Sequence, residues 1–510
     1  MSVRVTSGTV RGLEGALVHV EVDMQAGVSR FDIVGLPETA VKESKVRVQS
    51  TLRNLGFRPA SKAITVNLAP ADIRKSGSYF DLPIALGVLG CYEAFPAEGL
   101  EGKMFLGELS LDGSIRPVHG VLPMVIAAKE NGIGEVLVPE NNAEEASVVS
   151  GIKTLVVDSL PAAISYLRGN DCLKTAVPQK SSSGQRRIED FADVRGQSYA
   201  KRVLEIAAAG RHNVLMIGPP GSGKTMLARR LQTILPDLTY EEALECTRIY
   251  SVAGLLKRGG GLIKFRPFRS PHHTASGVSL TGGGSFPRPG EVSLAHCGVL
   301  FLDELPEWRR DVLETLRQPM EDGVVTVTRA SGTYTFPADF LLVAAMNPCP
   351  CGYFGDMRHK CSCSPRDIAR YRSKISGPLL DRIDLHVEVP AVPFKDLARP
   401  MPKSETSAEI KARVERAVMI QKERFKGTDT RFNGRMTPAQ VREFCKIGED
   451  ATGIMESAVE KLGLSARAVD KVLKVARTIA DLEGSEEIKA VHVAESVQYR
   501  LLDRYGSYWA

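Results

Sequence analysis

The sequence predicts a multidomain α/β fold, and three observations support that prediction. Apolar runs alternate with helical patterns over residues 1–170, which is typical of a mixed α+β domain. An apolar run near residue 217 leads through a glycine-rich turn into a helical pattern, as in a parallel-sheet domain. From residue 408 helical periodicity dominates without a strand pattern. A length of 510 residues fits about three such domains.

The first domain is predicted at residues 1–170. Strands are expected at 18–22, 63–67 and 135–138, and helices at 82–89 and 122–129. The other boundaries follow composition: a linker rich in Ser, Gly and basic residues at 171–187, a central domain at 188–392, a hinge rich in Pro and Lys at 393–407, and a helical domain at 408–510.

The segment IGPPGSGKT matches the phosphate-loop pattern G-x-x-x-x-G-K-[ST]. The apolar run 213–217 precedes it as a strand, and a helical pattern from Met226 follows, which is the context that the motif requires. Backbone N–H groups in such a turn and at the helix start face phosphates. The lysine places a charge on the β- and γ-phosphates, and the threonine hydroxyl is a Mg²⁺ ligand. The predicted nucleotide contacts are Gly218, Pro219, Pro220, Gly221, Ser222, Gly223, Lys224 and Thr225.

A second motif, VLFLDE, supplies carboxylates. Residues 299–302 are fully apolar, as a buried parallel strand is, and Asp303 and Glu304 follow directly. We expect Asp303 to hold Mg²⁺ with Thr225, and Glu304 to polarise an attacking water. Together the two motifs predict hydrolysis of a nucleoside triphosphate, with ATP and Mg²⁺ as cofactors.

Two insertions accompany these motifs in the central domain. Residues 265–289 are rich in Gly, Ser and basic side chains, and residues 324–336 read as a β-hairpin with Arg329 near its tip. A further buried strand at 341–345 leads to Asn347.

These insertions, in this order, resemble the magnesium-chelatase/MCM branch of AAA+ ATPases. The segments PETAVKESKVRVQSTL, NLAPADIRKSGSYFDLPIALG, FRSPHHTAS and GPLLDRIDLHVEVP resemble the ComM/YifB family, and the likeness spans nearly the whole chain. It implies a homo-hexameric, ATP-driven DNA helicase or branch-migration translocase that acts on single-stranded or branched DNA in recombination during natural transformation.

The resemblance also implies roles for three polar residues. Asn347 matches sensor 1, which orients the attacking water. Arg382 matches the arginine finger that reaches a neighbouring subunit's site, with Arg370 and Arg372 as rivals. Arg467 matches sensor 2 on the helical lid, and it would contact phosphate within its own subunit or across the interface. An arginine that works only on a neighbour implies a ring or a filament.

The stretch FLGELSLDGSIRPVHGVLPMVIAAKENGIGEVLVPE is similar to the proteolytic domain of Lon-type proteases. The family's nucleophilic serine corresponds to Tyr79 and its lysine partner to Leu122, so the acyl-enzyme route has neither nucleophile nor base. Ser78 with Lys75 is an alternative pair, but these two residues do not stand at the positions of the family's serine and lysine. The resemblance therefore implies a Lon-protease-like, non-catalytic α+β domain, a scaffold for nucleic acid or another partner.

Four cysteines lie close together after Asn347, in two C-x-C pairs: Cys349, Cys351, Cys361 and Cys363. Four thiolates satisfy a tetrahedral, structural Zn²⁺ site, and a metal would fix a loop that has little apolar content. His359 is an alternative ligand, and four reduced thiols or a redox-labile pair are the other interpretations.

Two places are candidates for contact with nucleic acid. One is the hairpin, where Tyr334 stacks on a base or packs on the sheet. The other is the first insertion with its flank, whose cations would contact phosphates without sequence preference or form a solvated loop. Its candidates are Lys264, Arg266, Arg269, His272 and His273, and the two histidines could also be read as a metal pair.

The overall composition and charge narrow the possible functions and the expected location of the protein. The net charge of +6 is compatible with nucleic acid without demonstrating it. No apolar run approaches the roughly 18 residues of a membrane span, and no secretory segment is found at the N-terminus, so we expect a cytoplasmic protein without a membrane partner. Two other functions stay open: a chelatase-like motor that inserts metal into a tetrapyrrole, and a protein-remodelling ATPase that does not act on DNA.

Overall fold

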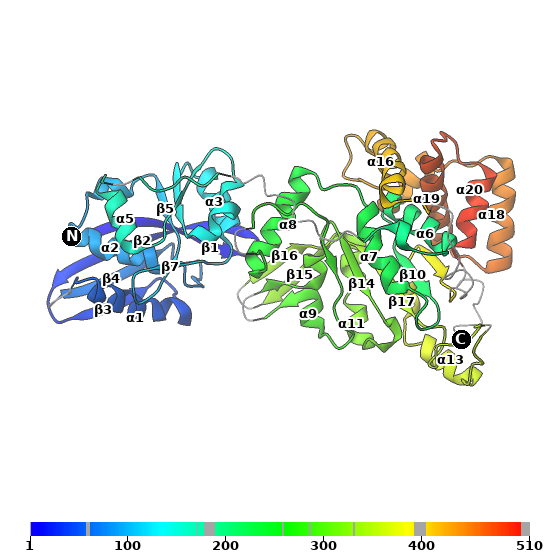
Figure 1. Cartoon of the computed structure of the whole chain (residues 1–510), viewed down its shortest axis with the longest axis horizontal. Coiled ribbons are helices and arrows are strands. Elements are labelled where there is room, and N and C mark those ends of the chain that lie inside the picture. The colour runs from blue at the N-terminus through cyan, green and yellow to red at the C-terminus, as the bar shows by residue number, and fades with distance from the viewer. Residues whose placement is uncertain are drawn as a thin grey trace. The chain divides into compact units, whose positions relative to one another are not determined.

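The computed structural model describes residues 2–57, 62–170, 172–177, 189–257, 260–284, 287–329, 332–356, 358–391 and 404–500 (Figure 1). Two compact units are described separately below: Met1–Gly184 with Tyr240–Lys264, and Gln185–Thr239 with Phe265–Ala510. Most of the predicted linker and hinge lies outside the described residues.

The first unit is built on a mixed seven-stranded sheet of order β3-β4-β2-β1-β5-β8-β9. Its inward faces carry valine, isoleucine and leucine at alternate positions, which the two-residue period of a strand sends to one side. All three predicted strands are present. The strands are β1 (Ser2–Arg11), β2 (Glu14–Ala26), β3 (Arg30–Val34), β4 (Lys62–Ala69), β5 (Lys103–Phe105), β8 (Glu135–Val138) and β9 (Lys153–Val156), with a separate ribbon of β6 (Glu108–Leu109) and β7 (Ile115–Arg116).

Helices cover this sheet, and both predicted helices are among them. Every residue of α2 (Asp81–Cys91) is buried, because the helix is apolar after its first residue and packs on β1 and β2; the buried Asp81 pairs with Arg47 over 2.6 Å. The other helices are α1 (Thr39–Asn54), α3 (Val121–Glu130), α4 (Ala143–Ser147) and α5 (Leu160–Leu167).

A segment from the middle of the chain belongs to this first unit. Helix α8 (Tyr240–Ala253) packs against α3. Gly120 N–H donates to the Ser251 carbonyl over 3.1 Å, and the Arg248 guanidinium donates to the Leu13 carbonyl over 3.0 Å. The Ser251 hydroxyl donates to the buried Glu145 carboxylate. The described residues of Tyr240–Lys264, which lie inside the predicted central domain in sequence, therefore belong to the first unit in space.

The second unit contains a parallel five-stranded sheet of order β11-β14-β17-β10-β18. Its central strands are apolar throughout and fully buried, as strands covered on both faces are. Because the strands are parallel, the residues that follow them meet at one edge of the sheet. The strands are β10 (Val214–Ile217), β11 (Phe268–Arg269), β14 (Val299–Leu302), β17 (Leu341–Met346) and β18 (Leu385–Glu388).

Two antiparallel ribbons extend from this unit. One joins β12 (Gly282–Gly283) to β13 (Arg288–Pro289), and the other is the predicted hairpin of β15 (Val324–Arg329) and β16 (Gly332–Pro337). The tip of the hairpin, residues 330–331, lies outside the described residues.

The helices of the second unit include α6 (Ser198–Gly210) and α7 (Lys224–Ile234), which pack on each other and on C-terminal helices. Polar caps fix several helix starts; the Thr406 hydroxyl, for instance, accepts the Glu409 N–H at the start of the eighteen-residue helix α16. As predicted, the described C-terminal part is helical: α16 (Ser407–Arg424), α17 (Pro438–Phe444), α18 (Glu449–Leu462), α19 (Ala466–Glu483) and α20 (Ala490–Gln498). Shorter helices are α9 (Gly277–Thr281), α10 (Glu291–Leu294), α11 (Arg310–Glu314), α12 (Arg317–Asp322), α13 (Pro365–Arg372) and α14 (Gly377–Leu380).

Candidate active site

The phosphate-loop motif forms the turn between β10 and α7. Gly223 has φ +90° directly before the helix, a conformation that glycine adopts without strain. A Cβ on Gly218 would lie 2.1 Å from the Val389 carbonyl oxygen, so only glycine fits there. Lys224 is 8% exposed, and its Nζ donates to the carbonyls of Gly218 over 2.7 Å and Pro219 over 3.0 Å.

The paired acids follow β14 at the same edge of the sheet. The Thr225 hydroxyl donates to Asp303 Oδ2 over 2.8 Å, which brings together the two residues predicted to hold Mg²⁺. The Asp303 carbonyl accepts the Trp308 indole N–H over 3.0 Å. Glu304 has φ +51° and ψ +45°, the left-handed conformation, in which a non-glycine residue is uncommon and which redirects its side chain.

Asn347 completes this edge. It follows the buried strand β17, and its Oδ1 lies 3.3 Å from Lys224 Nζ. Burial lowers the pKa of the Lys224 ammonium, and the nearby carboxylates of Asp303 and Glu304 act in the opposite direction. The strand order therefore gathers the loop, the acids and the asparagine into one polar site.

One residue at this site was not predicted to be there. His273 Nδ1 lies 3.1 Å from Glu304 Oε2, whereas the sequence suggested phosphate contact or a metal pair for this histidine. The sequence carried no clear signal for this contact, because the strand that precedes His273 has only two residues; in the structure Phe268 pairs with Val299 and Arg269 with Leu300. The pairing ends before both residues, and His273 and Glu304 lie in the segments that follow the two neighbouring strands.

The candidate finger and sensor arginines lie in a second cluster. Arg382 donates to the Pro378 carbonyl over 2.6 Å and to the Glu321 carboxylate over 2.5 Å. The exposed Arg467 lies 3.8 Å from Asp381, the residue before Arg382. The Arg382 hydrogen bond, helped by the charge of Arg467, lowers the pKa of Glu321. The carboxylate partner of Arg382 is therefore Glu321, and the carboxylate partner of Arg467 is Asp381.

The two rival arginines have other partners. Arg372 is buried, and its Nε and Nη2 both donate to the Pro348 carbonyl, over 3.1 and 3.0 Å. It therefore holds the turn that follows Asn347. Arg370 is 80% exposed at its side chain and pairs with Asp367 on its own helix.

The four cysteines that were predicted to bind zinc lie close together in the structure, and the first of them follows Asn347 by two positions in the chain. Their sulfurs lie within 4.8 Å of one another, and the measured pairs are 3.3 Å (Cys349–Cys351), 3.6 Å (Cys349–Cys361) and 3.5 Å (Cys351–Cys361). A tetrahedron with zinc–sulfur bonds of about 2.3 Å has edges of about 3.8 Å. The four residues are free cysteines rather than disulfides.

The surroundings of these sulfurs also fit thiolates. Backbone N–H groups of Phe354, Cys351 and Cys363 donate to the sulfurs of Cys349, Cys363 and Cys361 over 3.3–3.4 Å. His359 instead contacts Asp356, and its ring lies 4.7 Å from the Tyr353 ring, so it is not placed as a ligand.

The candidate nucleic-acid contacts divide into two groups. Arg329 on the hairpin reaches the Gly284 carbonyl over 3.4 Å, so the hairpin and the first insertion lie against each other. Tyr334 is partly buried and faces Val327 across the hairpin. Arg266 and Arg269 are structural: Arg266 is buried on backbone carbonyls, and Arg269 forms a bidentate pair with Glu291 at 2.7 Å.

In the first unit, Tyr79 and Leu122 stand at the positions of the Lon-type nucleophile and base, and neither side chain can take that role. Tyr79 is buried with its hydroxyl 2.8 Å from the Thr9 hydroxyl, and Leu122 is fully buried. The buried Lys75 ammonium donates to the Pro70 carbonyl, away from the alternative role with Ser78.

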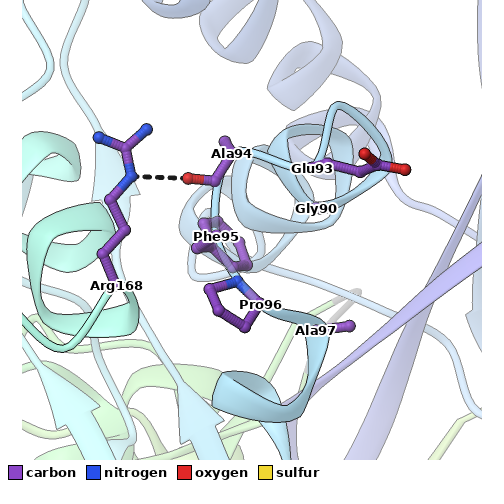
Figure 2. Close-up of a pocket in the computed structure, with 7 residues that line it drawn as sticks. All are labelled: Gly90, Glu93, Ala94, Phe95, Pro96, Ala97 and Arg168. Atoms are coloured by element: carbon purple, nitrogen blue, oxygen red, sulfur yellow. Dashed lines mark hydrogen bonds between the residues drawn. The ribbon is translucent and has the colours of Figure 1, made fainter.

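A shallow hollow of about 430 Å³ also lies in this unit, and Figure 2 shows Arg168 donating to the Ala94 carbonyl over 2.7 Å at its wall. It contains none of the predicted site residues. In the described part of the chain, no helix has the length and hydropathy required to cross a membrane.

The parallel sheet and the polar site at its edge define the class of P-loop nucleoside triphosphatases. Comparison with known proteins gives the family. Models described as magnesium chelatase, subunit ChlI; subunit ChlI of Mg-chelatase; and magnesium chelatase, subunit ChlI C-terminal match residues 190–397, 20–142 and 404–500.

Full-length relatives match as well. Competence protein ComM of Haemophilus influenzae is 44% identical over 507 residues, covering 98% of this chain and 97% of the relative. The uncharacterized protein YifB of Escherichia coli is 42% identical over 494 residues, 97% and 96% of the two chains. Lon protease 2 of Bacillus subtilis is 27% identical over 173 residues, 29% of this chain and 31% of the protease. The chain therefore belongs to the ComM/YifB family of magnesium-chelatase-like AAA+ ATPases.

Proposed function

We propose that this protein is a homo-hexameric, ATP-hydrolysing motor that acts on DNA. The reaction would be strand separation or branch migration during recombination, in the uptake of DNA by transformation, inside the cytoplasm. The observation that supports hydrolysis best is the meeting of Lys224, Thr225, Asp303 and Asn347 at one edge of the sheet. The competence name of the Haemophilus relative supports the process.

The residues at this edge fit ATP and Mg²⁺. Lys224 is held inside the loop, where its ammonium would neutralise the β- and γ-phosphates. The Thr225 hydroxyl and the Asp303 carboxylate would hold the metal, whose charge stabilises the phosphoryl oxygens during transfer. Glu304 would accept a proton from the attacking water, and Asn347 would orient that water.

The proposal of a ring rests on the positions of Arg382 and Arg467. Arg382 and Arg467 contact Glu321 and Asp381 rather than the phosphate loop that precedes α7. A guanidinium that stabilises transition-state charge must reach the γ-phosphate. We propose that both arginines do so in the neighbouring subunit's site, after exchanging their carboxylate partners for phosphate.

The DNA contact is proposed at the hairpin and the first insertion, which Arg329 joins. Because Arg266 and Arg269 are bound to carbonyls and to Glu291, the contact would rest on Arg329 and on the backbone of the glycine-rich ribbon. The first unit is proposed as a non-catalytic platform for DNA or a partner.

We also propose that the four cysteines hold one structural Zn²⁺. Four thiolates leave no open position for a substrate, so the ion would stabilise the turn beside Asn347 instead of taking part in chemistry.

The direct test is ATP-dependent strand displacement from a branched DNA junction. We expect displacement by the wild type and none by Glu304→Gln, which keeps the loop intact. Displacement that is equal in both proteins would contradict an ATP-driven motor.

A second candidate function is a chelatase-like or protein-remodelling ATPase, which the three magnesium-chelatase models favour. Its signature would be steady ATP hydrolysis that DNA leaves unchanged.

A further inference from the structure

The segment that carries the four cysteines also has an exposed positive surface, which the proposed zinc site does not use. We propose that this segment, residues 349–374 and called the cysteine loop below, is a second contact for single-stranded DNA, separate from the β15–β16 hairpin. It would bind phosphates through exposed cations and one base through an exposed ring. The inference rests on the proposed function, because it names a further DNA contact of the same motor.

The charge of the cysteine loop is concentrated and positive. Residues 353–374 contain two aspartates and six cations, namely Arg358, Lys360, Arg366, Arg370, Arg372 and Lys374. Four thiolates around one Zn²⁺ would leave two negative charges, so the loop stays positive even when a metal is bound. A positive surface attracts the phosphates of nucleic acid without regard to base sequence.

Half of these cations are exposed and form no salt bridge among the residues that the structure describes; they are Arg358, Lys360 and Arg366. The other three are occupied. Arg372 is buried, and Arg370 pairs with Asp367 over 2.7 Å. Lys374 Nζ lies 3.2 Å from a Glu307 carboxylate oxygen. The phosphate contact is therefore assigned to the three exposed cations.

Both aspartates of the cysteine loop bind groups of the loop itself. Asp356, whose side chain is 9% exposed, accepts the Arg358 N–H over 2.9 Å. Asp367 accepts the Ser364 hydroxyl over 2.7 Å at the start of α13. The two carboxylates thus fix the backbone, and the exposed cations keep a surplus of charge for phosphate.

An exposed ring lies among these cations. His359, between Arg358 and Lys360 in the chain, has a side chain that is 61% exposed. Its ring lies 4.7 Å from the Tyr353 ring, and its Nδ1 lies 3.1 Å from Asp356 Oδ2, so two contacts hold the imidazole. A held ring beside cations is the arrangement on which an unpaired base stacks. Because the bases of a duplex are already stacked, the surface fits a single strand.

The cysteine loop is anchored to the second unit apart from the hairpin. Ile368, Tyr371 and Arg372 form the buried side of α13, and the Arg372 guanidinium holds the Pro348 carbonyl. Figure 1 shows α13 well away from β15 and β16. Effects of changes at distant, independent sites add, so loss of this contact should be measurable while the hairpin is intact.

The test is the binding of fluorescent single-stranded oligothymidine, followed by anisotropy at pH 8 over a range of salt, with a non-hydrolysable ATP analogue present. The triple variant Arg358→Gln, Lys360→Gln and Arg366→Gln should raise the Kd on the order of tenfold at moderate salt. Each phosphate contact on a single strand contributes about 0.7 to the dependence of log K on log salt, so the slope should fall by about 2. His359→Ala should raise the Kd about fivefold without changing the slope, because stacking releases no counterion.

The matched control removes three exposed cations from helices α16 and α18: Arg416→Gln, Lys422→Gln and Lys461→Gln. It loses the same net charge and should bind DNA as the wild type does. DNA-free ATP hydrolysis and hexamer formation should be normal in both triple variants, because none of these cations contacts the phosphate loop.

Unchanged DNA affinity in the variant of the cysteine loop would overturn the second contact, while DNA binding by the wild type would leave the proposed motor standing. Equal losses of affinity in the two triple variants would reduce the effect to net charge and contradict the contact as well. Loss of hexamers in the cysteine-loop variant alone would assign the surface to a neighbouring copy of the chain. A wild type that binds no DNA would refute both the motor and the second contact.

Discussion

Lys224 Nζ lies 3.3 Å from Asn347 Oδ1, although 123 positions separate the two residues in the chain. Strand β10 leads to the first residue and its parallel neighbour β17 to the second. The adjacency of the two strands is what turns separate sequence motifs into one site, and each motif can be tested singly.

Removing the Lys224 ammonium should weaken nucleotide binding. Lys224→Ala loses a charge-assisted contact with phosphate, so we expect the Kd for ATP to rise on the order of 10- to 100-fold. Equilibrium binding of a fluorescent ATP analogue measures this. Arg229→Ala, an exposed change on the same helix, is the matched control and should bind normally. Equal affinities in all three proteins would remove Lys224 from the phosphate site.

Replacing the proposed general base should separate binding from hydrolysis. Glu304→Gln keeps the shape of the side chain but cannot accept the proton of water, so kcat should fall about 100-fold or more. ATP affinity should be retained, and ATP should remain bound. Single-turnover hydrolysis with radiolabelled ATP measures both properties. Normal turnover in Glu304→Gln would show that another group is the base.

The proposed action of Arg382 on a neighbouring subunit predicts complementation. Arg382→Ala alone should lower kcat on the order of 1,000-fold, as loss of an arginine finger does. Mixed rings with Lys224→Ala subunits should recover part of the activity, because some interfaces pair an intact finger with an intact loop. Arg370→Ala, whose side chain pairs on the surface with Asp367, is the control. Confirmed mixed rings without recovery would contradict the role of Arg382.

The cysteine cluster predicts one zinc ion per chain. Cys361→Ser should lose the metal, and ATP hydrolysis should fall because Cys349 lies two positions after Asn347. Cys172→Ser, an exposed change outside the cluster, should keep the metal and the activity. Elemental analysis of the purified proteins with parallel ATPase assays decides this. Wild-type protein that carries no zinc after purification and reconstitution would refute the site.

Sequence motifs predicted much of the fold because their local patterns are strong. The all-apolar runs before Asp303 and Asn347 are buried parallel strands, as expected. The packing of α8 against α3 in the first unit could not be predicted, since its carbonyl and carboxylate partners lie at least 100 positions away in the chain.

The partners of the positively charged side chains could not be predicted from the sequence either. Charge alone made Arg266 and Arg269 candidates for phosphate contact, but nearby carbonyls and Glu291 bind them. His273 could be connected with Glu304 only through the pairing of β11 with β14, which a two-residue strand does not reveal in sequence.

The most direct measurement is the steady-state rate of ATP hydrolysis without DNA, with single-stranded DNA and with a branched junction, at low and moderate salt. The proposed motor predicts stimulation by DNA, strongest for the branched form and weaker as salt rises, because phosphate contacts are screened. Equal rates under all conditions, with hydrolysis intact and hexamers confirmed, would contradict a DNA motor and favour a protein or metal-handling partner.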